Sequence, residues 1–238
     1  MYKAALLLLS VVIALYAYIA FALSVDNSVT LQDEIAIKSL MVDKACAYSQ
    51  KNFNEEIVCI TSIQAAVQNV GQEGCSVKSD IVEPLEFLKR GYGCCFDRAR
   101  FIEKAARYYG FSTRHVFLIQ PKYSISLSNL LPLEQSSHAV SEILTSKGWL
   151  GVGSVDPFLL LDENQDPYTY RDTIDNLNEF PSIHPKFFYF HLFKSFGFGG
   201  TIEDLDLIYG LYSRNGNFHG KNFPGPEYVF SELLWNLW

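Results

Sequence analysis

The chain has 238 residues, of which 49% are hydrophobic, and its formal net charge at pH 7 is −7. Without its apolar N-terminus it keeps about 215 residues, enough for one sizeable core with an appended C-terminal lobe. The negative charge and the lack of a basic run argue against nucleic acid as a partner.

The N-terminal segment Ala4–Leu23 is almost continuously apolar and carries no charge. Its length is close to the ~20 residues that cross a bilayer as a helix. Because Lys3 precedes the segment and acidic residues follow it, an N-in, C-out orientation is favoured. The small residues in Ala20-Phe21-Ala22 also offer a cleavage site, so a secretory signal is the alternative. We expect residues 1–24 to be a signal anchor or a signal peptide, with the rest of the chain outside the cytoplasm.

Helices are expected next along the chain. The range 30–52 is predicted to be helical, with Thr30 as its N-cap. Asn54 is predicted to cap a second helix, which two glycines end. Pro84 suits the first turn of a short helix over residues 85–89. The second helix carries an apolar stripe formed by Ile57, Ile60, Ile63, Ala66, Val67 and Val70.

A glycine-punctuated loop follows, and residues 91–99 read Gly-Tyr-Gly-Cys-Cys-Phe-Asp-Arg-Ala. The pattern places Cys95 at the first turn of a helix over residues 96–109, which Gly110 ends. Unpaired backbone N–H groups and the macrodipole at a helix N-terminus favour thiolate over thiol. The two loop glycines would let the backbone approach a substrate carbonyl. Cys95 is therefore predicted to be an activated nucleophile, whereas Asp97 is expected to be structural.

Three strands are predicted after the cysteine helix, over residues 112–119, 136–145 and 148–156. A short turn joins the last two, so they should form a hairpin with His138 and Asp156 near one end. Residues 120–135 are expected to form a loop that walls a substrate cleft. These elements predict an α+β fold, with helices packed on an antiparallel sheet.

A cysteine nucleophile needs a base to take its proton, and the base needs an acceptor that orients it. Cys95, His138 and Asp156 can fill these three roles. Their order and surroundings resemble the transglutaminase-like superfamily of papain-type thiol enzymes, over roughly residues 80–160. The matching pieces are Gly93-x-Cys95-x-Asp97-x-Ala99, His138-Ala139-Val140 followed by Glu142, and Gly148-Trp149 leading to Asp156-Pro157.

The resemblance selects Cys95 over Cys94, because the family's cysteine lies two residues before the aspartate. It departs at Val140, where many members carry an aromatic residue. It implies a transglutaminase-like, papain-like core over residues 25–165 that acts on protein or peptide amides through a thioester. Water would resolve the thioester in a peptidase or amidase, and an amine would do so in a transglutaminase. No metal or organic cofactor is implied.

The oxyanion of the tetrahedral intermediate would be met by the backbone N–H of Cys95 and by a second donor. The hydroxyl of Tyr92 is a candidate for that donor, although stacking of its ring in the loop is the simpler interpretation. No cysteine and histidine spacing resembles a zinc site.

Five cysteines fit an extracytoplasmic location. The residues Cys46, Cys59, Cys75 and Cys94 could form two disulfides in an oxidising compartment, which would leave Cys95 free. The alternative is that all five are reduced and that some are buried as small hydrophobes.

The C-terminal part, residues 166–238, is expected to be an aromatic-rich extension packed on the core. Residues 168–170 are predicted to be a short strand and residues 171–177 a helix. An aromatic concentration over residues 187–198 favours a core helix over a membrane-interface segment. The tail after residue 208 is loop-rich and resembles extensions of transglutaminase-like proteins from bacterial surface-polysaccharide loci.

Two other functions remain open. The fold could serve as a non-catalytic, membrane-tethered binding or assembly module in the cell envelope, for example in surface-polysaccharide export. A related thiol chemistry, such as amine acetylation from a small acyl donor, is a further alternative. The pattern leaves the oligomeric state undetermined.

Overall fold

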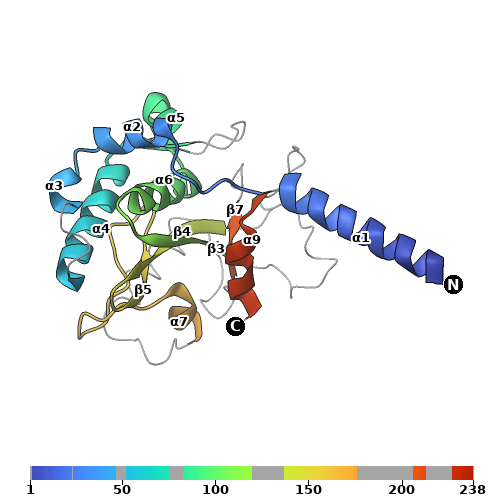
Figure 1. The fold of residues 1–238 in the computed structure, drawn as a ribbon. Helices are drawn as coiled ribbons and strands as arrows, with labels where there is room; N and C mark the ends of the chain where they lie inside the picture. Colours follow the sequence, from blue (N-terminus) through green and yellow to red (C-terminus); the bar gives the residue numbers. More distant parts are fainter. Residues whose placement is uncertain are drawn as a thin grey trace.

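A computed structural model describes residues 2–22, 24–46, 52–74, 83–119, 137–175, 206–212 and 227–237. The fold is α+β: helices cover a four-stranded antiparallel sheet, as Figure 1 shows. This confirms the predicted class and the layering of N-terminal helices on an antiparallel sheet. The predicted loop over residues 120–135 and the aromatic concentration over residues 187–198 lie outside the described residues.

The sheet has the strand order β5-β4-β3-β6. Strand β3 (Ser112–Ile119) has the predicted bounds, and β4 (Ser137–Thr145) starts at the first described residue of its range and ends where predicted. Strand β5 (Gly148–Val152) ends four residues before Asp156, so that part of the prediction is wrong. The chain bends there because the Asp156 carbonyl folds back onto Gly153, where a Cβ atom would lie 2.4 Å from that oxygen.

The fourth strand comes from the C-terminal part of the chain. Strand β6 (Asp206–Tyr209) pairs antiparallel with β3, with Phe117 opposite Ile208. Strand β7 (Leu211–Tyr212) follows and pairs with β8 (Glu227–Tyr228). The tail that was expected to be loop-rich after residue 208 therefore contributes strand residues at its start, and the extension completes the sheet instead of only packing on it.

The strand predicted over residues 168–170 is also wrong, because Tyr170 begins helix α7 (Tyr170–Asp175). Thr169 explains the difference. Its hydroxyl accepts a hydrogen bond from the Asp172 N–H at 3.0 Å, and the Asp172 carboxylate accepts one from the Thr169 N–H at 2.9 Å. This reciprocal pair is a capping box, which favours a helix start over a strand.

The N-terminal helices follow the prediction with two corrections. Thr30 caps α2 (Leu31–Ser39) as predicted, but the expected long helix divides at Met41, which has a positive φ of 58°. A short helix, α3 (Asp43–Cys46), follows. Helix α4 (Phe53–Gln68) is capped by Asn52 rather than Asn54, because the Asn52 side chain accepts the Glu55 N–H.

Apolar residues fill both faces of the sheet. Between the helices and the sheet, Ile60 and Ile63 of α4 pack with Phe101 of α6 (Cys95–Tyr108) and with Ile143 of β4. The opposite face of the sheet has its own cluster, made by Val116, Leu118, Val140, Leu160, Tyr170, Leu207 and Tyr209. Helix α6 is thus enclosed, and its charged residues from Arg98 to Lys104 are buried as well.

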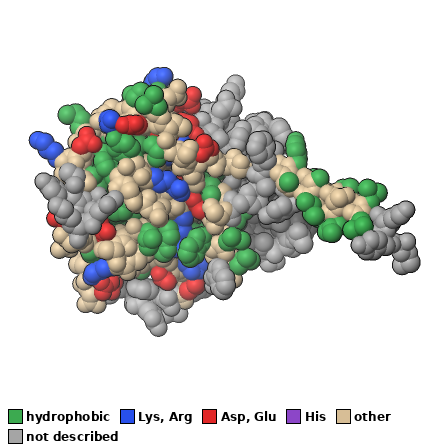
Figure 2. Space-filling view, in the orientation of Figure 1, with side chains coloured by type: hydrophobic (Ala, Val, Ile, Leu, Met, Phe, Trp, Pro, Cys, Tyr) green, Lys and Arg blue, Asp and Glu red, His purple; other side chains and the backbone are tan. Residues whose placement is uncertain are grey.

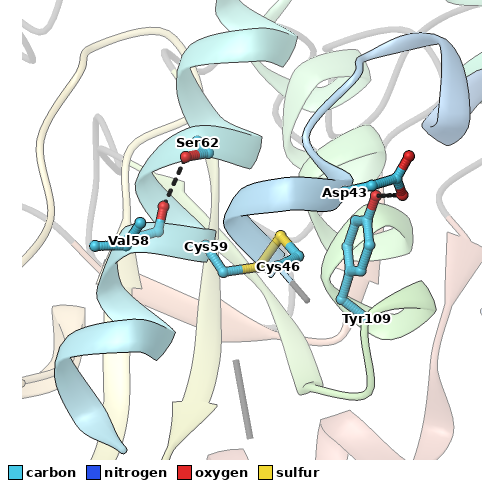
Figure 3. The surroundings of a disulfide bond; sticks show 6 residues. All are labelled: Asp43, Cys46, Val58, Cys59, Ser62 and Tyr109. Atoms are coloured by element: carbon cyan, nitrogen blue, oxygen red, sulfur yellow. Dashed lines mark hydrogen bonds between the residues drawn. A yellow bond between two sulfur atoms is a disulfide. The ribbon is translucent and has the colours of Figure 1, made fainter. Parts of the chain in front are cut away.

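A disulfide between Cys46 and Cys59 joins α3 to α4, and Figure 3 shows its surroundings. Beside it, the Tyr109 hydroxyl donates to the Asp43 carboxylate at 2.8 Å, which ties the end of the α6 region to the same corner. Cys94 is also disulfide-bonded, and Cys95 is free. These states confirm the predicted division of the described cysteines; Cys75 lies outside the described residues.

The apolar N-terminal segment forms helix α1 (Tyr2–Ala22), which projects from the body of the protein in Figure 1. Its described side chains, at positions 6–15, 17 and 18, are exposed. Within the described part of the chain, no helix combines the length and the apolar character needed to cross a membrane. The signal or transmembrane role of residues 1–24 stays a prediction.

Candidate functional site

The glycine loop delivers Cys95 to the start of α6. Helix α5 (Pro84–Arg90) begins with Pro84, as predicted, and ends at Gly91, whose φ of 70° suits glycine. Tyr92 and Gly93 form β2, which pairs in parallel with β1 (Gln72–Glu73). At Gly93 an added Cβ would lie 2.3 Å from the Phe87 ring, so no side chain fits there. Cys95 is the first residue of α6, as the sequence predicted.

Asp97 fixes the backbone just before the cysteine. Its carboxylate accepts the Cys94 N–H at 2.9 Å and the Arg90 guanidinium at 2.7 Å. Arg90 also covers the Tyr92 ring at 4.7 Å and donates to the Tyr92 carbonyl. Asp97 is therefore structural, as expected. The Tyr92 ring is stacked, and its role at an oxyanion stays a prediction.

The thiol of Cys95 lies against strand β4, one residue after His138. The backbone N–H of Ala139 donates a hydrogen bond to the Cys95 sulfur, and so does the N–H of Phe96 in the first turn of α6. His138 begins the strand and is only 2% exposed. The structure thus brings the sulfur of Cys95 to the backbone that carries His138.

The loop that carries Asp156 meets the same point of β4. The Ser154 hydroxyl donates to the Ala139 carbonyl at 2.6 Å. Ala139 therefore contacts the nucleophile through its N–H and the loop of the predicted acid through its C=O. This confirms that His138 and Asp156 lie near one end of the β4–β5 hairpin. The pairing of the His138 imidazole with the Asp156 carboxylate stays a prediction.

Two glutamines that the sequence analysis missed hold the Asp156 loop. The Gln64 side-chain amide donates to the carbonyls of Gly153 (2.8 Å), Asp156 (3.2 Å) and Phe158 (2.9 Å). One turn later on α4, Gln68 donates to the Asp156 carbonyl at 2.9 Å. The available signal was a polar residue inside the apolar stripe of α4, since Gln64 is 2% exposed between Ile63 and Val67.

The same end of α4 also holds the cysteine helix. Arg98 of α6 donates to the backbone carbonyls of Val67 and Gln68, at 3.1 and 2.9 Å. These are among the last carbonyls of α4, which favour a cation at this end of the helix. The C-terminal turn of α4 is therefore a brace between the helix of Cys95 and the loop of Asp156.

Burial shifts the pKa values at the site in a direction opposite to that expected from the helix N-terminus alone. Desolvation raises the pKa of Cys95 to about 11, although the Ala139 and Phe96 N–H groups act to lower it. Desolvation also lowers the pKa of His138 to about 3. For Cys95 the cost of burying a charge exceeds the stabilisation from the helix end, so the N-terminal position alone does not lower its pKa. The activation of Cys95 as a nucleophile stays a prediction. At neutral pH the Cys95 thiol and the His138 imidazole are therefore both uncharged.

The buried imidazole makes the protein sensitive to acid. An unfolded histidine has a pKa of about 6.5, so between pH 6.5 and 3 the unfolded chain binds a proton that the folded chain excludes. The free energy of unfolding should therefore fall by roughly 3 kcal/mol on this account as the pH drops from 7 to 4. In urea titrations over this range, His138→Gln should show a dependence that is shallower by that amount. Parallel profiles for the two proteins would contradict the burial of a neutral imidazole.

Replacing Gln64 should loosen the loop of Asp156. Gln64→Leu keeps the size of the side chain but removes the two amide N–H groups that three carbonyls share, which we expect to cost about 1–3 kcal/mol in the free energy of unfolding. Amide hydrogen exchange over residues 153–158 should accelerate with it. Thr61→Val, one turn earlier on the exposed side of α4, is the matched control and should change neither. Unaltered exchange in Gln64→Leu would show that the loop holds its shape without this amide.

No group of three or more metal-ligating side chains lies close enough to hold a metal ion among the described residues. The fold and site define an α+β protein with one free cysteine in the described chain, placed at a helix N-terminus against a histidine-bearing strand. No protein-family model, curated protein or solved structure matches the chain.

Proposed function

We propose that the protein is a membrane-anchored, extracytoplasmic thiol enzyme with a transglutaminase-like core. It acts on protein or peptide amides through a thioester on Cys95, either as a peptidase or amidase or by transglutaminase-type acyl transfer. One observation carries the proposal: the free Cys95 thiol accepts the Ala139 N–H next to His138, whereas the other described cysteines are disulfide-bonded. A nucleophile beside a candidate base is the arrangement that acyl transfer needs.

In the proposed reaction the neutral His138 imidazole removes the Cys95 proton as the sulfur attacks the amide carbonyl. The lowered His138 pKa and the raised Cys95 pKa favour this concerted deprotonation over a standing ion pair. Backbone N–H groups at the start of α6 stabilise the oxyanion. The tetrahedral intermediate then collapses, the protonated imidazole gives its proton to the leaving amine, and a thioester remains. Water or an acceptor amine attacks the thioester and releases Cys95.

The location rests on two features. The Cys46–Cys59 disulfide and the bonded state of Cys94 fit an oxidising compartment. Helix α1 is apolar on every described side chain except Ser10, and the positive-inside tendency puts the domain outside the cytoplasm. Together they support an anchored protein whose domain works in the cell envelope.

A non-catalytic envelope module linked to surface polysaccharide is the second candidate. The observation that favours it is the burial of the candidate base and acid: His138 is 2% exposed and Asp156 is 8% exposed, whereas Cys95 is partly exposed. A binding module would keep a neutral thiol and a histidine that no acyl donor reaches. In that case Cys95 should react slowly with iodoacetamide at neutral pH and form no acyl adduct with any amide or ester donor.

The test is to trap the thioester. The full-length chain in detergent is mixed with peptide amides and activated acyl esters, quenched in acid, and mapped by mass spectrometry, with and without dansylcadaverine as an acceptor amine. We expect an acyl adduct on Cys95 that Cys95→Ala lacks, and the amine shortens its lifetime only if transamidation occurs. Asp156→Asn should keep the loop in place, since Gln64 and Gln68 bind the Asp156 backbone, and it therefore tests the carboxylate as the proposed acceptor that orients His138. Full turnover in Cys95→Ala would refute the proposal.

A further inference from the structure

The last described residues form a short turn with exposed apolar side chains. This turn, η2 (Leu234–Leu237), follows helix α9 (Phe230–Leu233), and is called the C-terminal turn below. Leu234 is 60% exposed, Trp235 43% and Leu237 76%. Residues three apart eclipse one another in a 3₁₀ helix, so the two leucines lie on one side of the turn.

On an ordinary solvated surface the polar side chains face outward and the apolar side chains face inward. The C-terminal turn has the reverse arrangement. The one polar residue of the turn, Asn236, is the one that faces the body: its side chain accepts the Tyr209 N–H at 2.9 Å and donates to the Tyr209 carbonyl at 3.1 Å. Trp235 is held edge-on against Trp149, with the Arg114 guanidinium 4.7 Å from its ring. The leucines are therefore presented outward by a turn that is fixed to the sheet.

The C-terminal turn lies close to where α1 leaves the domain. Asn27 donates to the Glu232 carboxylate at 3.0 Å, two residues before the turn begins. Val25 is already buried, and three residues of extended chain from the end of α1 span at most about 11 Å. Figure 1 shows the end of α1 beside α9. Whatever surrounds the Ala22 end of α1 is therefore within reach of the C-terminal turn.

We propose that Leu234, Trp235 and Leu237 insert into the membrane interface beside α1 and hold the domain against the bilayer. The inference rests on the anchor of the proposed function and adds a second contact to it. Leucine and tryptophan are the side chains that enter the boundary between head groups and acyl chains. With α1 as the only contact, the domain could rotate freely relative to the membrane. A second contact through the C-terminal turn would fix its orientation.

Depth-dependent quenching tests the contact on the full-length chain. In a Cys95→Ala background, single thiols from Leu237→Cys, Leu234→Cys, Leu9→Cys and Thr61→Cys are labelled with an environment-sensitive fluorophore. Each protein is reconstituted in phosphatidylcholine vesicles with some phosphatidylglycerol, with doxyl quenchers near the head group or at the chain end. The label at Leu9 reports on α1, and the label at Thr61 reports on an exposed site of α4.

We expect labels at Leu234 and Leu237 to be quenched about threefold more than the label at Thr61, most strongly by the head-group quencher, as an interfacial position requires. Quenching at Leu9 but not at Leu234 and Leu237 would overturn the contact and leave the anchor intact. No quenching at Leu9 would show that the anchor itself fails, and the contact with it. If the fluorescence of the labels at Leu234 and Leu237 changes with the amount of protein per vesicle and not with the quencher, the surface binds a second copy of the chain. That result would overturn the proposal.

Discussion

Replacing His138 with alanine is expected to slow acylation of Cys95 by about 10²–10⁴-fold, the usual contribution of a positioned general base. The effect should be large because the Cys95 thiol, with a pKa of about 11, has almost no thiolate of its own at neutral pH. Single-turnover acylation, followed by mass spectrometry at several pH values, measures it. As the pH approaches the pKa of the Cys95 thiol, the acylation rates of the unsubstituted protein and of His138→Ala should converge.

Exogenous imidazole separates a base from a merely structural histidine. His138→Ala leaves a buried space of imidazole size, and imidazole that enters it should restore part of the acylation rate. If His138 has only a structural role, imidazole should restore the stability of His138→Ala but not its acylation rate. His138→Ala with an undiminished acylation rate would remove His138 from the mechanism.

Glu142→Ala should have the largest effect on stability, with a loss of about 3–5 kcal/mol in the free energy of unfolding. Glu142 is fully buried, and its carboxylate binds the Arg114 guanidinium at 2.6 Å and the Tyr170 N–H at 2.8 Å. Without the carboxylate, a buried guanidinium and the first N–H of α7 lose their acceptor. Urea denaturation measures the loss.

Two comparisons make this result specific. The double variant Arg114→Met with Glu142→Leu removes both charges and should be more stable than Glu142→Ala. Glu34→Ala breaks an exposed ion pair with Lys38 and should cost no more than about 0.5 kcal/mol. Equal losses in the free energy of unfolding for Glu142→Ala and Glu34→Ala would mean that the buried ion pair contributes no more to stability than the exposed one.

Local signals predicted most of the fold. Strand β3 was predicted to the residue because β-branched and aromatic side chains fill it between clear breaks. The cysteine helix and its glycine stop followed from equally local rules, and Gly110 has the expected positive φ of 92°. The errors arose where two local signals compete. Both Asn52 and Asn54 can cap α4, and Thr169 with Asp172 overrides the β-propensity of its tyrosine neighbours.

Long-range contacts account for the rest. No local pattern marks β6 as a partner of β3, since the two strands are far apart in the chain. At the site, the positions of Cys95, His138 and Asp156 along the elements could be predicted, but their burial could not. Burial depends on the packing of α4, α6 and the sheet together, and it is burial that sets the pKa values of Cys95 and His138.

The junction at Ala139 has a consequence for how this site can vary. Both of its contacts, the N–H to the Cys95 sulfur and the C=O to the Ser154 hydroxyl, come from the main chain. A small residue at position 139, which is fully buried, would keep them, whereas proline would remove the N–H. The Asp156 loop is likewise held through its main chain, because the side chains of Gln64 and Gln68 bind its carbonyls. The geometry of such a site depends on the path of the backbone. Distant relatives can therefore preserve it after the amino acids that line it have changed.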